Sequence, residues 1–266
     1  MIYQGEANGE ISSSNKTGIT TTIGALKYNR NYNDNAYVGY MMGIPVVDGT
    51  NTTHSTSYSG AHSNIYNSDG KVALDNWYLN NIANNTEYSK NVDINTGFCN
   101  DRELSSGTYG YTGAGYGVQD SAYAPAGRVA GSNRGSYRSP QVPTLQCTNK
   151  ERDLFTHTNA NNGNKKLTYP IGMITMDEAI FAGGFAGTQN KSYYLCVDRE
   201  YHTMTPEYYY SYSTTFSIND QGQIDWGAVA GSNYYIRPVI NLKADTKFSY
   251  NSEFTKGSEA DPFVVS

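Results

Sequence analysis

The side chains that most often do chemistry in proteins are histidines, cysteines and paired carboxylates, and their spacing here does not form a catalytic pattern. None of the four histidines has the spacing of a metal motif such as HExxH. Asp198 and Glu200 are placed to share one face of a strand, as in a calcium site or a glycosidase pair, but solvated polar side chains have the same spacing. No Gly-x-Ser-x-Gly elbow is present. We therefore expect no catalytic residue, no metal site and no cofactor.

The cysteines leave two interpretations open. Cys99, Cys147 and Cys196 lie far apart in the chain, and an odd number cannot pair completely. An oxidising compartment would give one disulfide and one remaining thiol, whereas a reducing one would give three buried thiols. Cys99 would act as a nucleophile only beside a histidine and in an activating environment.

Tyrosine is the residue type that could recognise a partner. Tyr208, Tyr209, Tyr210 and Tyr212 are almost consecutive, and the alternation of a strand would place three of them on one face and Tyr209 on the other. Tyrosine offers a large rigid contact with a polar tip, which favours a binding surface. A cross-strand aromatic ladder that only stabilises a sheet is the alternative. The expected ligand-binding surface also includes His202, Trp226, Asn233 and Tyr234.

Composition limits the partners. Only 16% of the 266 residues are charged and the net charge is −5, so the chain has no basic field for nucleic acid or for an anionic membrane. With 25 tyrosines, part of the aromatic surface must fill the interior. No apolar run reaches the roughly 20 residues of a membrane span. We expect a signal or anchor to have preceded Met1, so that any membrane attachment depends on that missing segment.

Two helices and several short strands must position these residues. Ser68 or Asp69 can cap a helix whose apolar face contains Leu74, Trp77, Tyr78 and Ile82. The spacing of Thr175 and Glu178 predicts a capping box for a helix over residues 176–182, which ends at a Gly-Gly pair. Strands are predicted at residues 36–41, 169–174, 192–197, 214–218, 224–226 and 236–242, with a hairpin turn at 220–223 and a long loop at 107–117. This pattern predicts an α+β fold.

The order of several segments resembles a domain common in surface proteins of gut Firmicutes. The motifs are the Trp77 helix at residues 67–81, a strand and a "DEA" helix at 169–184, a "Y-H-T-M-T-P" segment at 201–206, an "I-R-P-V-I-N-L-K" strand at 236–243 and the tail at 261–265. The resemblance implies a C-type-lectin-like fold related to the formylglycine-generating enzymes, in which an arginine strand containing Arg237 closes the core. It also implies an N-terminal polar segment (1–34) and a single binding domain (35–266). In its pilin-like subgroup Cys99 and Cys147 would form a disulfide, leaving Cys196 unpaired.

The same fold is similar to that of the variable proteins of diversity-generating retroelements, in which adenine mutation turns Asn codons into Tyr, Ser, Asp or His codons. Residues 196–212 and 225–235 are rich in these types. We therefore expect an extracellular, cell-surface adhesin-like domain, displayed on a cell, pilus or phage particle, that binds a protein or glycan receptor on another cell. The alternatives are a structural pilin-like subunit and an enzyme of the formylglycine-generating type. That enzyme's paired reactive cysteines are absent, since Cys196 stands alone.

Overall fold

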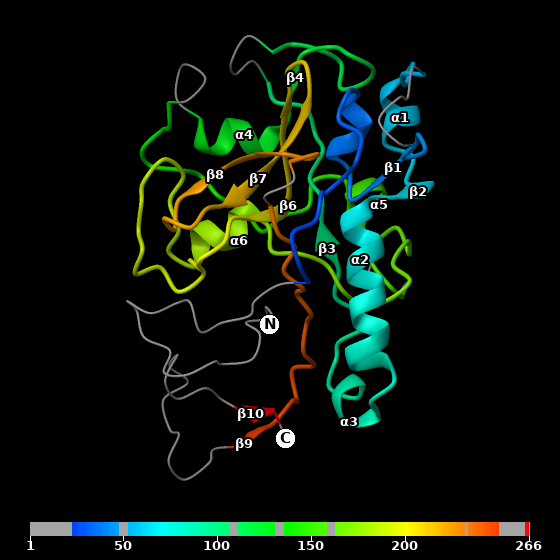
Figure 1. Cartoon of the computed structure of the whole chain (residues 1–266), viewed down its shortest axis with the longest axis vertical. Coiled ribbons are helices and arrows are strands. Elements are labelled where there is room, and N and C mark those ends of the chain that lie inside the picture. Colours follow the sequence, from blue (N-terminus) through cyan, green and yellow to red (C-terminus); the bar gives the residue numbers. More distant parts are fainter. Residues whose placement is uncertain are drawn as a thin grey trace.

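The computed structural model describes residues 23–47, 53–106, 111–130, 136–158, 163–231, 234–249 and 264–265. It is a mixed α/β structure with short helices and curled antiparallel sheets, which is compatible with the predicted α+β class. Figure 1 shows the main sheet and its helices on one side of the body and α2 on the other.

The longest sheet has four antiparallel strands in the order β4-β6-β7-β8. Its strands are β4 (Ser121–Ala122), β6 (Tyr201–Tyr209), β7 (Ser213–Ile218) and β8 (Ile224–Ala228). Three two-stranded sheets pair β1 (Met41–Met42) with β2 (Tyr66–Asn67), β3 (Phe98–Cys99) with β5 (Leu154–Phe155), and β9 (Phe248–Ser249) with β10 (Val264–Val265).

The described α-helices are short except for one. They are α1 (Tyr58–Ala61), α2 (Asp69–Tyr78), α3 (Thr86–Ser89), α4 (Ala124–Val129), α5 (Lys150–Asp153) and α6 (Met176–Phe181). A 3₁₀-helix, η1 (Asn35–Val38), precedes them, and a π-helix, η2 (Leu79–Ala83), extends α2. The expectation of two helices was therefore too low, because isolated single turns have no hydrophobic periodicity to reveal them.

Local capping signals placed the two predicted helices correctly. The Ser68 hydroxyl accepts a hydrogen bond from the backbone of Lys71 at the start of α2, and Leu74 and Tyr78 are buried. At α6 the side chains of Thr175 and Glu178 form the predicted capping box. Each cap satisfies backbone N–H groups that the first helical turn leaves unpaired.

The β7–β8 hairpin is also confirmed. Its strands pair from Thr214↔Ala228 to Ile218↔Ile224. The Asn219 side chain accepts hydrogen bonds from the backbones of Gln221 and Gln223, and Gly222 has a φ of 72°. A left-handed residue at this point favours glycine, since a Cβ would be strained there.

Four predicted strands are wrong. In residues 36–41, the Asp34 carboxylate caps the backbone N–H of Ala36 and begins a 3₁₀-helix instead. Residues 192–197 form turns. Residues 169–174 and 236–242 meet only through the isolated bridge Gly172↔Val239. Each of these two segments contains a proline, which cannot donate to a sheet ladder.

Two hydrophobic clusters fill the interior. One lies under α2 and includes Tyr28, Tyr40 and Leu74. The other lies between the long sheet and helices α4 and α6, and includes Phe216 and Ile218 of β7. Tyr28 lies before Asn35 in the sequence, so the packed body includes residues from the segment predicted to precede the domain.

Candidate functional site

Three of the tyrosine-surface residues predicted from the sequence are buried. His202 is inaccessible to solvent, and Tyr208 and Tyr209 keep only 2% and 3% of their surface exposed. They lie in β6, whose residues are all buried; β4 and β7 pair along its two edges, and its residues Met204 and Tyr201 belong to the two hydrophobic clusters. The prediction that these three side chains contact a partner is therefore wrong.

The remaining predicted residues reach the surface to different degrees. Tyr210 and Trp226 are exposed, at 41% and 38%, and Tyr212 and Tyr234 are half-buried. Asn233 lies outside the described residues. The accessible part of the predicted surface is thus the turn after β6, together with Trp226 on the outer strand β8.

The predicted alternation of tyrosines ends at the end of β6. Ser211 has a φ of 61°, and the backbone N–H of Tyr210 donates to the carbonyl of Tyr212. This left-handed residue turns the chain into β7, so Tyr208, Tyr210 and Tyr212 do not share one strand face. The hairpin instead presents Tyr210 at its tip.

A cluster of aromatic rings supports that tip. The ring of Tyr111 lies 5.2 Å from the ring of Tyr210 and 5.8 Å from that of Tyr208, with tilts of 31° and 39°. Tyr111 is held there by the bridge Thr112↔Ser121, which joins its loop to the edge of the sheet. The sequence predicted only a long loop at residues 107–117 and did not single out Tyr111. Tyr208 stays buried beneath Tyr111, and we call the pair Tyr111 and Tyr210 the tyrosine tip.

His202 is buried between two tyrosine rings. Its ring lies 4.6 Å from that of Tyr234 and 5.6 Å from that of Tyr28, and its Nδ1 is 2.8 Å from the Thr215 hydroxyl. Burial lowers the pKa of His202 to about 3. Its imidazole is therefore neutral at physiological pH and serves packing.

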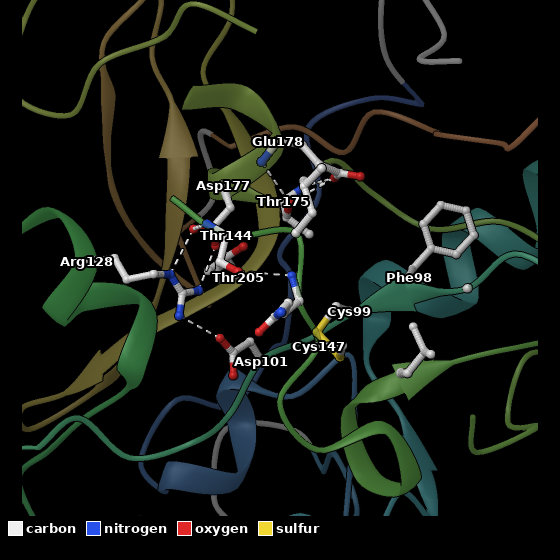
Figure 2. Close-up of a pocket in the computed structure, with 14 residues that line it drawn as sticks. Phe98, Cys99, Asp101, Arg128, Thr144, Cys147, Thr175, Asp177, Glu178 and Thr205 are labelled. Carbon is white, nitrogen blue, oxygen red and sulfur yellow. Dashed lines mark hydrogen bonds and ion pairs between the residues drawn. A yellow bond between two sulfur atoms is a disulfide. The ribbon is translucent and has the colours of Figure 1, made fainter. Parts of the chain in front are cut away.

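A second site lies next to the disulfide. Cys99 and Cys147 form a disulfide in the structure, while Cys196 is a buried thiol outside any disulfide. A cavity of about 110 Å³ lies beside that disulfide. Asp101, Arg128 and Asp177 line its polar side (Figure 2). These come from three places: after β3, in the last turn of α4 and in the first turn of α6.

Arg128 holds two carboxylates in this cavity. Its Nε and Nη2 donate to the two Asp177 oxygens at 2.8 and 2.6 Å, and its Nη1 lies 2.8 Å from Asp101 Oδ2. The Thr144 backbone also donates to Asp177. Both Asp101 carboxylate oxygens are buried; among the described residues Oδ1 has no hydrogen-bond partner, and Oδ2 has only the ion pair with Arg128. Burial raises the pKa of Asp101, and Arg128 offsets part of that effect. No local motif linked these residues in the sequence.

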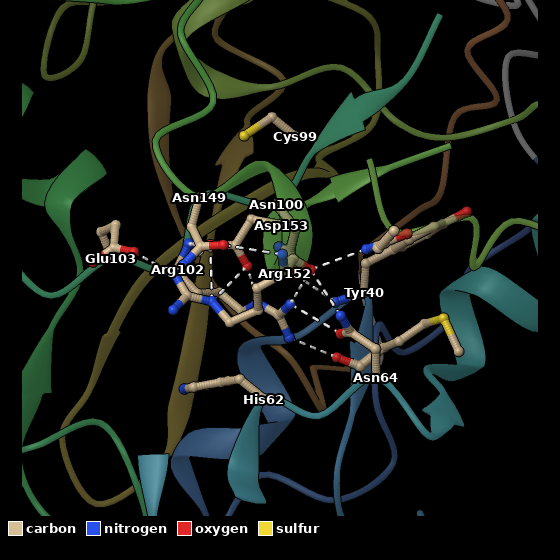
Figure 3. Close-up of polar contacts among 12 residues, drawn as sticks. Tyr40, His62, Asn64, Cys99, Asn100, Arg102, Glu103, Asn149, Arg152 and Asp153 are labelled. Carbon is tan, nitrogen blue, oxygen red and sulfur yellow. Dashed lines mark hydrogen bonds and ion pairs between the residues drawn. The ribbon is translucent and has the colours of Figure 1, made fainter. Parts of the chain in front are cut away.

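A third polar cluster is structural. Figure 3 shows Arg102, which is fully buried, between Asp153 and Asn64. Its Nε is 2.7 Å from Asp153 Oδ1, its Nη1 donates to the Met41 carbonyl and its Nη2 donates to Asn64 Oδ1. These bonds join β1, the segment before β2 and α5. Because every guanidinium nitrogen has a partner, this cluster holds these segments together and has a structural role.

The other predicted candidates form no shared site. Glu200 accepts a hydrogen bond from the Ser217 hydroxyl, whereas Asp198 lies 3.7 Å from Arg199. Within the described ranges, no three histidine, cysteine or acidic side chains gather as metal ligands would. No helix in this part of the chain is long and apolar enough to cross a membrane. Comparisons with protein families, curated proteins and solved structures found no match to this chain.

Proposed function

We propose that the chain is a non-catalytic recognition domain that binds a protein or glycan receptor on another cell through the tyrosine tip. The observation that carries this proposal is the exposed ring of Tyr210, held against Tyr111 at a hairpin turn. Tyr212 and Ser211 flank it. Tyrosine and serine are the residues that recognition loops use most, because tyrosine contributes contact area and serine contributes adaptable hydrogen bonds.

Rigidity at the tip favours binding. A side chain that is mobile before binding loses roughly 0.5–1.5 kcal/mol of conformational freedom when a partner fixes it. The Tyr210 ring is already packed on Tyr111, and the backbone of the turn is closed by the Tyr210–Tyr212 hydrogen bond. Most of this entropic cost therefore arises during folding and not on binding. A larger share of the contact energy then appears as binding affinity.

An extracellular C-type-lectin-like domain is part of the proposal. Two observations support it. The disulfide between Cys99 and Cys147 is the pairing that the resemblance implies, and disulfides persist in oxidising compartments. Arg237 is buried 4.5 Å from the Tyr201 ring and donates to the Leu195 carbonyl, as an arginine that closes the core would.

The test measures binding of the fluorescently labelled chain to a glycan array and to intact gut bacterial and epithelial cells. We expect Tyr210→Ala to weaken binding by at least about tenfold, as a central aromatic contact does. Tyr88→Ala is the matched control. It removes a ring that is 59% exposed on α3, at the opposite end of the molecule from β4 (Figure 1). Protease or glycosidase treatment of the cells separates protein from glycan receptors. An equal effect of both substitutions would contradict the proposal.

Diversification by a retroelement is a further part of the proposal. The burial of Tyr208 and Tyr209 limits the codons at which substitutions can be tolerated. Variation at Tyr208 or Tyr209 would disturb the sheet, whereas Tyr210, Ser211 and Tyr212 can change at the surface. Deep sequencing of the gene in sibling cells should therefore find adenine-derived substitutions at these three codons and few at the two buried ones. An invariant turn would exclude diversification and leave a receptor of fixed specificity.

A structural pilin-like subunit is the second candidate, and the disulfide favours it because that pairing is implied by the pilin-like subgroup. In this case the exposed aromatic rings would pack against neighbouring subunits. Size-exclusion chromatography over a range of concentrations discriminates the two candidates. Oligomers that grow with concentration and disappear in Tyr210→Ala would favour the subunit, and a monomer at all concentrations would favour the recognition domain.

A further inference from the structure

A groove of about 530 Å³ lies between residues 25–30 and helix α2. This volume is within the range of about 300–1,000 Å³ that is usual for ligand sites. The Gly70 backbone N–H donates to the Tyr28 carbonyl at 3.0 Å, and the Arg30 backbone N–H donates to Asp69 Oδ2 at 2.8 Å. These hydrogen bonds hold the two walls together, so the groove is part of the folded body.

Residues 25–27 present one backbone edge to a partner strand. Their other edge is paired, because the Leu26 N–H donates to the Tyr234 carbonyl at 2.9 Å. Hydrogen-bonding groups alternate in direction along such a segment, so those of Ala25 and Lys27 point away from that pairing. Both residues are exposed and line the groove, and neither backbone is hydrogen-bonded to another described residue. An extended peptide can therefore add to this edge through main-chain hydrogen bonds.

Apolar side chains form both walls of the groove. Val72 and Ala73 line the α2 side, and 44% of the Val72 surface is exposed although α2 buries its opposite face. Leu26 lies on the other side and packs against the hydrophobic cluster under α2. An apolar side chain that enters the groove is removed from water between these walls, which is favourable in proportion to the area buried.

The charge of the groove favours an acidic segment. The Nε of Arg30 is 3.1 Å from both oxygens of Asp69 and its Nη2 is 2.7 Å from Oδ1, so these two charges offset each other. Lys27 is exposed and forms no ion pair with a described residue. Lys27 and Arg30 against Asp69 give the groove a formal charge of +1, in a chain whose net charge is −5. A carboxylate can therefore approach Lys27 without meeting an unpaired acidic side chain of the groove.

We propose that this groove binds an extended segment of a partner protein in which an acidic residue lies beside aliphatic residues. The backbone of the segment pairs with residues 25–27, an aliphatic side chain packs between Leu26 and Val72, and the carboxylate meets Lys27. The groove shares no residue with the tyrosine tip, so this inference goes beyond the proposed function and does not depend on it.

The experiment titrates the whole ¹⁵N-labelled chain with the acetylated peptide amide Thr-Val-Glu-Val-Thr and follows backbone amide shifts by NMR. We expect saturable shifts at Lys27, Val72 and Asn76. The same peptide with Gln in place of Glu should bind about two- to fivefold more weakly, as the loss of an exposed ion pair does. Main-chain pairing uses only alternate residues of the peptide. N-methylation of one alternate set should therefore weaken binding by at least about twofold, and N-methylation of the other set should not.

Two variants and a control make the test decisive. Lys27→Gln should remove the preference for the Glu peptide over the Gln peptide. Lys191→Gln, at an exposed lysine outside the groove, should retain that preference. Val72→Ala keeps the helix, since alanine is the better helix former, and should weaken both peptides by at least about twofold.

Four outcomes would overturn the proposal: equal binding of the Glu and Gln peptides, an unchanged preference in Lys27→Gln, shifts confined to residues outside the groove, or no binding at millimolar peptide. Shifts at the same amides that depend on the concentration of the chain alone would assign the groove to a second copy of the chain. That result would also overturn the proposed partner.

Discussion

Tyr209 and Tyr210 are neighbours of identical chemistry whose replacement should have opposite consequences. Tyr209→Ala removes a ring of which only 3% is exposed, in a strand paired on both sides. Truncating a large buried aromatic side chain costs about 3–5 kcal/mol. Tyr210→Ala removes a ring that is 41% exposed and loses its packing on Tyr111. An aromatic pair contributes about 0.5–1.5 kcal/mol.

Urea denaturation followed by far-UV circular dichroism measures both variants against the parent chain. The midpoint should fall strongly for Tyr209→Ala and only slightly for Tyr210→Ala, with the slope of the transition unchanged. In thermal melts, each kcal/mol corresponds to about 2–4 °C for a chain of this size. Equal losses of stability, or a larger loss for Tyr210→Ala, would refute the assignment of Tyr209 to the interior and Tyr210 to the binding surface.

Three further predictions concern the interior. Arg102→Met should lower the free energy of unfolding by about 3–5 kcal/mol because it leaves buried acceptors unpaired. The control Arg199→Met, at an exposed position, should change the free energy of unfolding by less than about 0.5 kcal/mol. Equal urea midpoints for the two variants would argue against the buried network. The pKa of His202 is about 3 in the folded chain and about 6.5 in the unfolded chain. The neutral buried imidazole therefore contributes its full stability above about pH 6.5, and this contribution is lost as the pH falls below that. Between about pH 7 and about pH 5 we expect a loss of about 2 kcal/mol, absent in His202→Gln; an equally steep decline in that variant would assign the loss to other groups. The double variant Cys99→Ser, Cys147→Ser opens a loop with a sequence separation of 48 residues. Calorimetry should show a loss of up to about 4 kcal/mol in the free energy of unfolding. An unchanged transition would show that the disulfide does not constrain the unfolded chain.

Features fixed by neighbouring residues were predicted well from the sequence. The cap at Ser68, the box formed by Thr175 and Glu178, and the β7–β8 turn each depend on side chains within four positions of the backbone atoms they bind. Sheet membership was predicted less well. Residues 236–242 have the composition of a strand, but Pro238 lacks an N–H and no described partner offers more than single bridges.

The candidate sites show the same limit. Composition identified the tyrosine segment, but burial of Tyr208 and Tyr209 depends on pairing with β4 and β7, which lie on both sides of β6. The left-handed Ser211 breaks the period that the sequence suggested. Asp101 and Asp177 meet at Arg128 across long stretches of chain, and no spacing rule connects three such distant segments.

The most direct test of the central claim places a photo-activatable phenylalanine analogue at position 210 or, as the control, at position 88. Both positions are exposed tyrosines in the parent chain, so the substitution retains an aromatic ring at each. After irradiation on receptor-bearing cells, mass spectrometry of cross-linked products identifies which position contacts the receptor. We predict a cross-linked receptor from position 210 and none from position 88. Cross-linking from position 88 alone, or equally from both, would contradict recognition through the tyrosine tip.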